Sequence, residues 1–254
     1  MTSSATVVLG RVRGGLVVGL AGFVATSWMY LAFVATQMGD VSSVLSMPMT
    51  AAWTPVQAAL MVAMWAVMMA AMMLPSAVPM VLAYDRMNRG PLNAGYGSTS
   101  LFVAGYVVVW GAFAVAAAGL QWLLHSVALV DGKGVVTQGW FAGGLLIGAG
   151  IVQFSPGKMR SLGACRTPMG FLMTSWRDGR EGALRMGLHH GRLCFGCCWS
   201  LMILLFVLGV MNLAWVAVLA IFVLAEKVTR RGVVISMVGG VVLMLWGVVV
   251  VLGG

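Results

Sequence analysis

Long apolar stretches alternate with short polar segments along almost the whole chain. A helix that crosses a bilayer needs roughly 20 predominantly apolar residues. Stretches of about this length occupy residues 14–36, 55–83, 100–124, 138–154, 199–224 and 233–252. The pattern predicts an all-α fold, a polytopic transmembrane helix bundle of about six spans. Residues 1–254 would form a single transmembrane domain.

The number of spans has an alternative. If residues 187–209 formed a span and the chain broke at Gly209–Asn212, there would be seven crossings. We expect six, because residues 199–224 contain no strong break. With six spans, eleven basic residues lie on the side of the membrane that carries the N-terminus and four lie on the opposite side. Cytoplasmic loops carry the excess of Lys and Arg. Both termini are therefore expected in the cytoplasm, with the bundle in the plasma membrane.

Composition supports the membrane class. The chain is 61% hydrophobic and only 8% charged, with a mean hydropathy of +1.00, whereas soluble domains carry about 25% charged residues. The net charge of +9 could indicate nucleic acid binding. However, the basic residues lie between apolar stretches, and no aromatic–basic motif accompanies them. The expected surroundings are the lipid bilayer, and no nucleic acid partner is expected.

One polar segment, residues 155–197, separates the fourth and fifth spans. It holds seven of the fifteen basic residues. Residues 168–176 are apolar, and residues 181–193 carry apolar and basic side chains at helical spacing. Amphipathic helices of this kind lie on a membrane surface. We expect one or two interfacial helices here, which return the end of the segment to the bundle.

That end carries the strongest chemical signal. Cys194, Cys197 and Cys198 form a Cys-x-x-Cys-Cys motif. Thiolates bind copper(I), zinc and iron–sulfur centres, and neutral imidazole binds zinc and copper. A tetrahedral metal site could be completed by the remaining cysteine and by the histidines that precede the motif, which are Cys165, His189 and His190. Nearby cations would favour thiolate; these are Arg166, Arg185 and Arg192.

Methionines supply a second possible set of soft ligands. Met61, Met64, Met68 and Met72 share one arc of the second span. Thioethers bind copper(I) without deprotonation. A methionine stripe can equally be packing, because Met is a flexible apolar filler. A Met47-Pro48-Met49 triplet lies in the preceding outer loop, which strengthens the prediction of a soft-metal path.

Three stretches of sequence together resemble a known bacterial family. They are Met64–Pro75 (MWAVMMAAMMLP), Cys165–Pro168 (CRTP) and Gly187–Trp199 (GLHHGRLCFGCCW). The chain is similar to an uncharacterised family of predicted metal-binding integral membrane proteins. The resemblance implies a membrane fold and the importance of the Met and Cys/His segments. It does not identify the reaction or the metal.

The sequence thus favours a membrane protein that binds a soft metal ion, copper(I) before zinc, for transport or for delivery to a partner subunit or metallochaperone. One alternative is a membrane thiol–disulfide oxidoreductase that uses the Cys-x-x-Cys pair, although a cytoplasmic site argues against a stable disulfide. Another is a non-catalytic subunit or assembly factor of a membrane metalloenzyme complex. Whether the protein is an enzyme is left open. The Glu226–Lys227 pair is expected at the membrane interface.

Overall fold

The computed structural model describes residues 3–37, 53–88, 97–131, 135–210 and 212–253, and these residues form an all-α bundle. This confirms the predicted fold class. The helices are α1 (Ser3–Gln37), α2 (Pro55–Asn88), α3 (Gly97–Ser126), α4 (Gly139–Val152), α5 (Pro156–Arg166), α6 (Pro168–Ser175), α7 (Gly179–Ile203), α8 (Leu205–Leu208), α9 (Leu213–Val228) and α10 (Gly232–Gly253).

Among the described residues, five segments are long and apolar enough to cross a membrane. They are Val17–Thr36, Pro55–Asn88, Ser98–Ser126, Gly179–Leu208 and Gly232–Gly253. Helix α4 is apolar but shorter. The outward side of α10 is lined with exposed aliphatic residues, among them Leu245 and Val249. Apolar surface of this extent suits a lipid environment.

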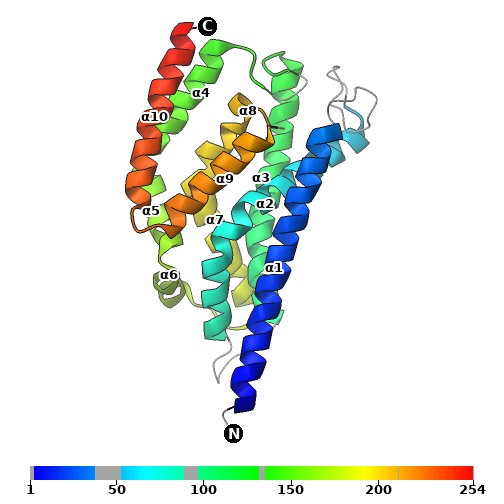
Figure 1. Cartoon of the computed structure of the whole chain (residues 1–254), viewed down its shortest axis with the longest axis vertical. Coiled ribbons are helices and arrows are strands. Elements are labelled where there is room, and N and C mark those ends of the chain that lie inside the picture. The colour runs from blue at the N-terminus through cyan, green and yellow to red at the C-terminus, as the bar shows by residue number, and fades with distance from the viewer. Residues whose placement is uncertain (1–2, 38–52, 89–96, 132–134, 211, 254) are drawn as a thin grey trace.

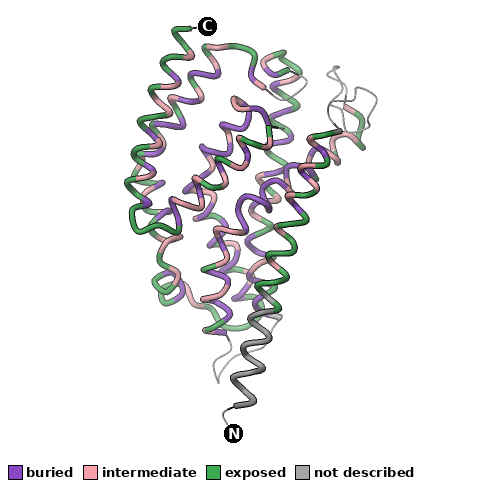
Figure 2. The backbone as a smooth tube through the Cα atoms, viewed as in Figure 1, coloured by how far each residue is buried: buried purple, intermediate pink, exposed green. Residues whose placement is uncertain are grey.

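The helices are arranged around α2, α3 and α7, which carry most of the buried residues (Figure 2). Helix α7 packs along α3, α10 packs along α4, and α1 leans against α2 at the edge of the bundle (Figure 1). Helix α2 contains Pro75 and Pro79 and changes direction along its length (Figure 1). Proline removes a backbone donor and bends a helix, which accounts for this change of direction.

Glycines allow α7 to lie very close to α3. A Cβ on Gly187 would collide with the carbonyl oxygen of Phe102, and a Cβ on Gly105 would lie 2.5 Å from the carbonyl oxygen of Leu184. Small residues permit this close backbone approach between membrane helices. One turn further along α7, Gly191 faces Tyr106 and Val109. The crossing therefore fixes the part of α3 that faces the cysteines of α7.

The fifth predicted span, residues 199–224, is wrong as a continuous helix. Helix α7 runs without interruption to Ile203, α8 adds one turn, and the chain then breaks at Gly209, whose φ is +94°. Only glycine adopts this backbone conformation readily. Asn212 begins α9. The break lies where the seven-span alternative requires it.

Two further expectations change with this break. Residues 181–193 are not a separate interfacial helix but the first half of α7, while α5 and α6 occupy the rest of the predicted polar segment. Because the extra break reverses the chain once more, α1 begins and α10 ends at opposite ends of the bundle (Figure 1). This arrangement differs from a six-span bundle, in which the first and last helices would start and finish at the same end.

Candidate metal centre

Three thiols of α7 form a compact cluster inside the bundle. The sulfur atoms of Cys194, Cys197 and Cys198 all lie within 4.8 Å of one another, because residues three and four positions apart share a helix face. The three residues are at most 1% exposed. Among the His, Cys, Asp and Glu side chains of the described residues, these three cysteines are the group close enough together to hold a metal ion. All four cysteines of the chain are free of disulfides.

The thiols are held by the backbone of their own helix. Cys197 and Cys198 both donate their S–H groups to the carbonyl oxygen of Cys194, at sulfur–oxygen distances of 3.0 and 2.9 Å. These weak bonds orient both sulfurs toward the same side of α7. A metal ion would replace the thiol protons, since the thiolate is the ligand form.

Helix α2 contributes a fourth sulfur. The Sδ atom of Met73 lies 3.7 Å from the Sγ atom of Cys198. The backbone carbonyl of Met73 accepts hydrogen bonds from the hydroxyls of Ser76, at 2.8 Å, and of Tyr106, at 3.1 Å. The Tyr106 bond attaches this turn of α2, just before Pro75, to α3, whereas the Ser76 bond lies within α2. The cysteine cluster and the methionine-rich helix, which the sequence separates widely, thus meet at Met73.

Two polar groups reach Cys194 from other helices. The Tyr106 hydroxyl of α3 lies 3.1 Å from its sulfur. The Lys227 ammonium nitrogen of α9 lies 2.9 Å from the same sulfur and donates a second bond to the Ser76 hydroxyl, also at 2.9 Å. Lys227 is only 7% exposed. A buried ammonium beside thiols favours their ionised form.

The expectation that Glu226 and Lys227 form an interface pair is wrong, because these neighbours are both buried and have different partners. Glu226 accepts two bonds from the Lys158 ammonium of α5, each at 3.0 Å. This ion pair anchors the end of α9 and so directs Lys227 toward the cysteines. Burying a charged pair requires such good geometry. The cation at the thiols is therefore Lys227.

The arginines predicted to serve that role lie elsewhere. Arg166 donates to the backbone carbonyls of Thr229 and Arg230 in the turn after α9, both at 2.7 Å. Arg185 pairs with Glu181 on the exposed side of α7. Arg192 is exposed and lines a surface cavity.

Cys165, on α5, approaches the cluster from its outer side. The interaction of its thiol with Cys197, followed by burial, raises the pKa of Cys165 well above its usual value. Its sulfur is not one of the three that are mutually within 4.8 Å. Cys165 therefore contacts one member of the cluster and not the whole set.

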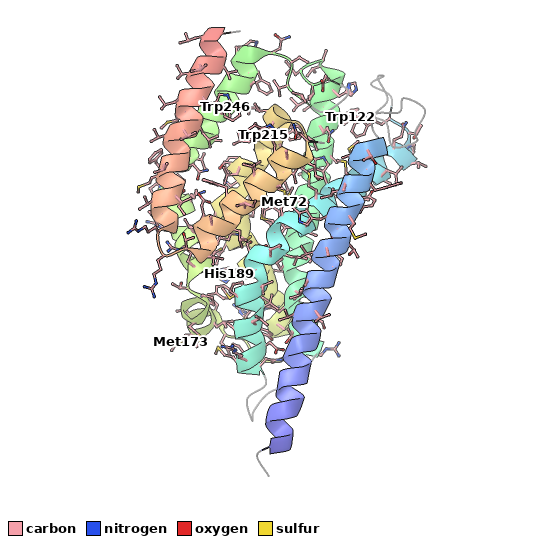
Figure 3. The ribbon with its side chains drawn as sticks, in the orientation of Figure 1. Met72, Trp122, Met173, His189, Trp215 and Trp246 are labelled. Carbon is pink, nitrogen blue, oxygen red and sulfur yellow. The ribbon has the colours of Figure 1, made fainter. Side chains whose placement is uncertain are left out.

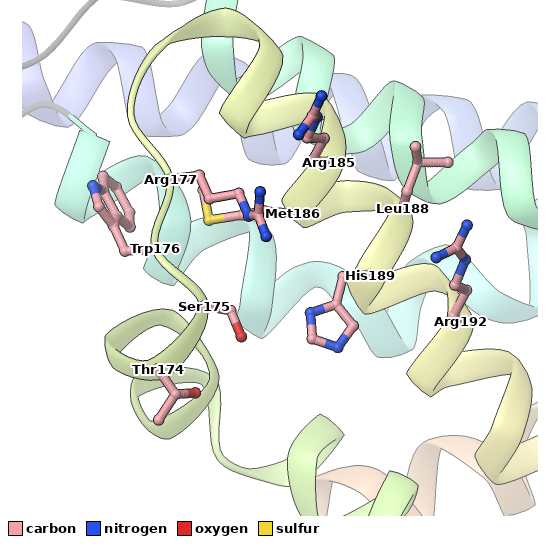
Figure 4. A pocket seen from close by; sticks show the side chains of 9 residues that line it. All are labelled: Thr174, Ser175, Trp176, Arg177, Arg185, Met186, Leu188, His189 and Arg192. Atoms are coloured by element: carbon pink, nitrogen blue, oxygen red, sulfur yellow. The ribbon is translucent and has the colours of Figure 1, made fainter.

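The two histidines point in different directions. His190 is 3% exposed, stacks on the rings of Phe102 and Tyr106, and has an Nδ1 atom with no hydrogen-bond partner among the described residues. His189 is exposed and faces a cavity between α6 and α7 (Figure 4). The structure brings neither histidine into the group of close thiols.

The predicted methionine arc is buried along its whole length. Met61, Met64, Met68 and Met72 are between 1% and 7% exposed, and Met72 lies in the middle of the bundle (Figure 3). Met64 and Met68 line a small cavity of about 10 Å³, together with residues of α1 and α9 and with Val210. The Met47-Pro48-Met49 triplet lies outside the described residues.

Sequence reasoning did not select Met73, Tyr106 or Lys227 as members of the site. Met73 belongs to the same methionine-rich stretch, but helical spacing places it on the face next to the predicted arc of Met61, Met64, Met68 and Met72. Lys227 carried a usable signal, because a charged residue at the end of an apolar helix is costly to bury and often functional. Tyr106 had no signal in the sequence, since only the α3–α7 crossing brings it to Cys194.

Comparison with known protein families gives a match that covers most of the chain. The family described as PpoB2 copper chaperone matches residues 62–250. The chain belongs to this copper chaperone family. The matched region contains every cysteine and also Met73, Tyr106 and Lys227. No curated protein and no solved structure matches the chain. Membership supports copper binding and delivery in general, and the thiol cluster is a place where a copper chaperone could hold its ion.

Proposed function

We propose that this copper chaperone is an integral membrane protein that holds copper(I) between Cys194, Cys197 and Cys198 and delivers it to a partner protein. The observation that supports the site is the convergence of three buried thiols with the thioether of Met73. Thiolate and thioether ligands are the soft ligands that copper(I) prefers.

The surroundings of the thiols favour copper(I) over zinc. Zinc sites are almost always tetrahedral, with a fourth thiolate, imidazole or carboxylate. Here the atoms next to the thiols are a thioether, a phenol and an ammonium group. The histidines, which would suit zinc, lie outside the group. Copper(I) accepts an all-sulfur set without such a ligand.

Charge gives Lys227 a clear role in this proposal. Copper(I) bound by three thiolates carries a formal charge of −2, and an uncompensated buried charge is costly. The Lys227 ammonium, 2.9 Å from the Cys194 sulfur, offsets half of it. The Tyr106 hydroxyl lies beside the same sulfur but donates its single proton to the Met73 carbonyl. Lys227 is therefore the group that stabilises the thiolate form that binds the metal.

The bundle is expected to cross the membrane seven times, with α7 and α8 forming one crossing. With the start of α1 in the cytoplasm, a seven-span chain that breaks at Gly209 would have the turn after α9 inside. Fourteen of the fifteen basic residues then lie toward the cytoplasm, and Lys133 alone lies outside. This is a stronger positive-inside bias than six spans give. Helices α5 and α6 would lie at the inner surface.

Helix α2 supplies a path for the ion in this arrangement. From Met61 to Met73 the helix rises about 18 Å, at roughly 1.5 Å per residue. Thioethers at Met61, Met64, Met68 and Met72 line this length of buried helix. A neutral soft ligand can carry a monovalent cation through apolar surroundings without adding buried ligand charge. We propose that these methionines connect the outer half of the bundle to the thiols.

Burial weighs against the thiol–disulfide oxidoreductase alternative. Exchange requires a thiolate that can attack an approaching disulfide, and so depends on access. Cys194, Cys197 and Cys198 are at most 1% exposed. A metal ion can reach such a cluster through thioethers, whereas a protein dithiol cannot.

The proposal is tested by measuring metal content. Protein purified in detergent is loaded with copper(I) under reducing conditions, and bound copper is measured for wild type, a Cys194→Ser/Cys197→Ser variant and Cys165→Ser. We expect about one copper per chain, with a sulfur-only shell by X-ray absorption. The double variant should lose the ion and Cys165→Ser should keep it. Copper retained by the double variant, or a shell of nitrogen and oxygen, would contradict the proposal.

A further inference from the structure

A cavity of about 690 Å³ lies on the surface where α6 leads into α7 (Figure 4). Cavities of 300–1,000 Å³ are typical of small-ligand sites. Its lining includes Ser175 and Trp176, the exposed face of α7 at His189, and three arginines, Arg177, Arg185 and Arg192. In Figure 4 the His189 ring points into the space between the two helices.

The lining is strongly basic and contains no acidic residue. Arg185 pairs with Glu181 on the adjacent turn, at 2.6 Å, but both side chains are more than half exposed, and exposed pairs of this kind are weak. Among the described carboxylates, none forms an ion pair with Arg177 or Arg192. At least two guanidinium groups are thus available to an anion.

The donor set suits a phosphate group. Guanidinium forms paired, charge-assisted hydrogen bonds with phosphate oxygens. The Ser175 hydroxyl and the His189 ring can add further donors from the same cavity. The Thr174 hydroxyl also lines the cavity, but it already donates to the Gly170 carbonyl at 2.9 Å.

The position of the cavity favours a lipid as the source of the phosphate. Helix α6 exposes Met169 and Met173, at 56% and 75%, and exposed apolar side chains on a short helix can contact acyl chains. The neighbouring Trp176 is half-buried, as is typical of the membrane interface. In the proposed topology this segment lies at the inner surface, where basic pockets bind anionic headgroups.

We infer that the cavity binds the phosphate of an anionic phospholipid headgroup through Arg177 and Arg192. This inference rests on the proposed membrane placement but not on copper binding. Such a lipid would hold α6 against the part of α7 that precedes Cys194, from Arg185 to Arg192.

The test measures binding of short-chain phosphatidylglycerol to purified protein in detergent, and the change in Trp fluorescence reports the binding. Short-chain phosphatidylcholine and inorganic phosphate are measured in parallel. We compare wild type, Arg177→Gln/Arg192→Gln and a control, Arg160→Gln/Arg231→Gln, which removes the same charge from exposed sites outside the cavity. Phosphatidylglycerol should bind best, and only the cavity variant should weaken it, by about tenfold or more, as losing charge-assisted hydrogen bonds implies.

Equal binding by the cavity and control variants would overturn the inference, because charge alone would then account for it. Inorganic phosphate binding as tightly as phosphatidylglycerol would overturn the lipid as the source. Copper content and the thermal unfolding midpoint should be unchanged in the cavity variant. Copper content therefore distinguishes failure of this inference from failure of the proposed copper site.

Discussion

The Lys227 ammonium nitrogen lies 2.9 Å from the Sγ atom of Cys194 inside the bundle. A lysine aimed at a thiol cluster is unexpected for a site that takes up a cation, because the two positive charges repel. The position of Lys227 is explained if the occupied site has a net negative charge, as a complex of copper(I) with three thiolates does. Lys227 then offsets charge in the loaded state and stabilises thiolate in the free state.

This relationship predicts the effect of removing the charge. Lys227→Met should weaken copper(I) binding by about 100- to 4,000-fold, because removing one partner from a buried charged pair costs about 3–5 kcal/mol. Lys227→Arg keeps the charge and should recover much of the affinity. Competition with a chromophoric copper(I) chelator measures both. Tighter binding by Lys227→Met would mean that Lys227 competes with the ion.

The thioether of Met73 gives a second prediction. Met73→Leu keeps the volume of the side chain, and such exchanges usually cost less than about 1.5 kcal/mol of stability. Copper(I) affinity should nevertheless fall by about tenfold, because a soft ligand 3.7 Å from Cys198 is lost. Met80→Leu is the matched control, since Met80 is equally buried on α2 but packs in a separate core cluster with Tyr84 and Phe102. The same chelator competition distinguishes them, and equal losses would refute a ligand role for Met73.

The α3–α7 crossing gives a prediction about stability. Gly187→Ala places a Cβ against the carbonyl oxygen of Phe102, so the helices must separate. Overpacking of this kind typically costs about 1–3 kcal/mol, and the shift should also move Tyr106 away from Cys194. Thermal unfolding in detergent and copper content should both decrease. Gly119→Ala, on α3 with nothing within 4 Å of its added Cβ, should leave copper content unchanged and should not lower the unfolding midpoint, because Ala is the better helix former.

The buried Lys158–Glu226 ion pair can be tested by comparing single and double substitutions. Glu226→Gln leaves the Lys158 charge buried without its partner and should destabilise the fold by about 3–5 kcal/mol. Lys158→Met/Glu226→Leu removes both charges and should cost much less, since apolar replacement of buried pairs is often near neutral. Chemical unfolding in detergent measures the difference. If the double variant is as unstable as the single one, the pair contributes through packing rather than charge.

The sequence anticipated the fold class because apolar stretches of membrane-spanning length require helices whatever their neighbours. It also anticipated the three thiols of α7, since the Cys-x-x-Cys-Cys spacing places them on one face of any helix. It failed at residues 199–224, where a single glycine conformation at Gly209 outweighs a continuous apolar composition. That break changed the count of helices and the relative positions of the two ends of the chain.

The sequence by itself therefore determined which soft ligands this member of the copper chaperone family possesses and that its helices are apolar. Only the tertiary structure decided which of them meet. Met73 and Lys227 join Cys194 and Cys198, while His189 faces a separate basic cavity. The physical reason is that the spacing of residues along a helix determines which face of that helix each side chain lies on. Which residues of other helices contact that face depends on how the helices pack together. Here the packing is set by the close glycine contact between α3 and α7 and by the ion pair that anchors α9.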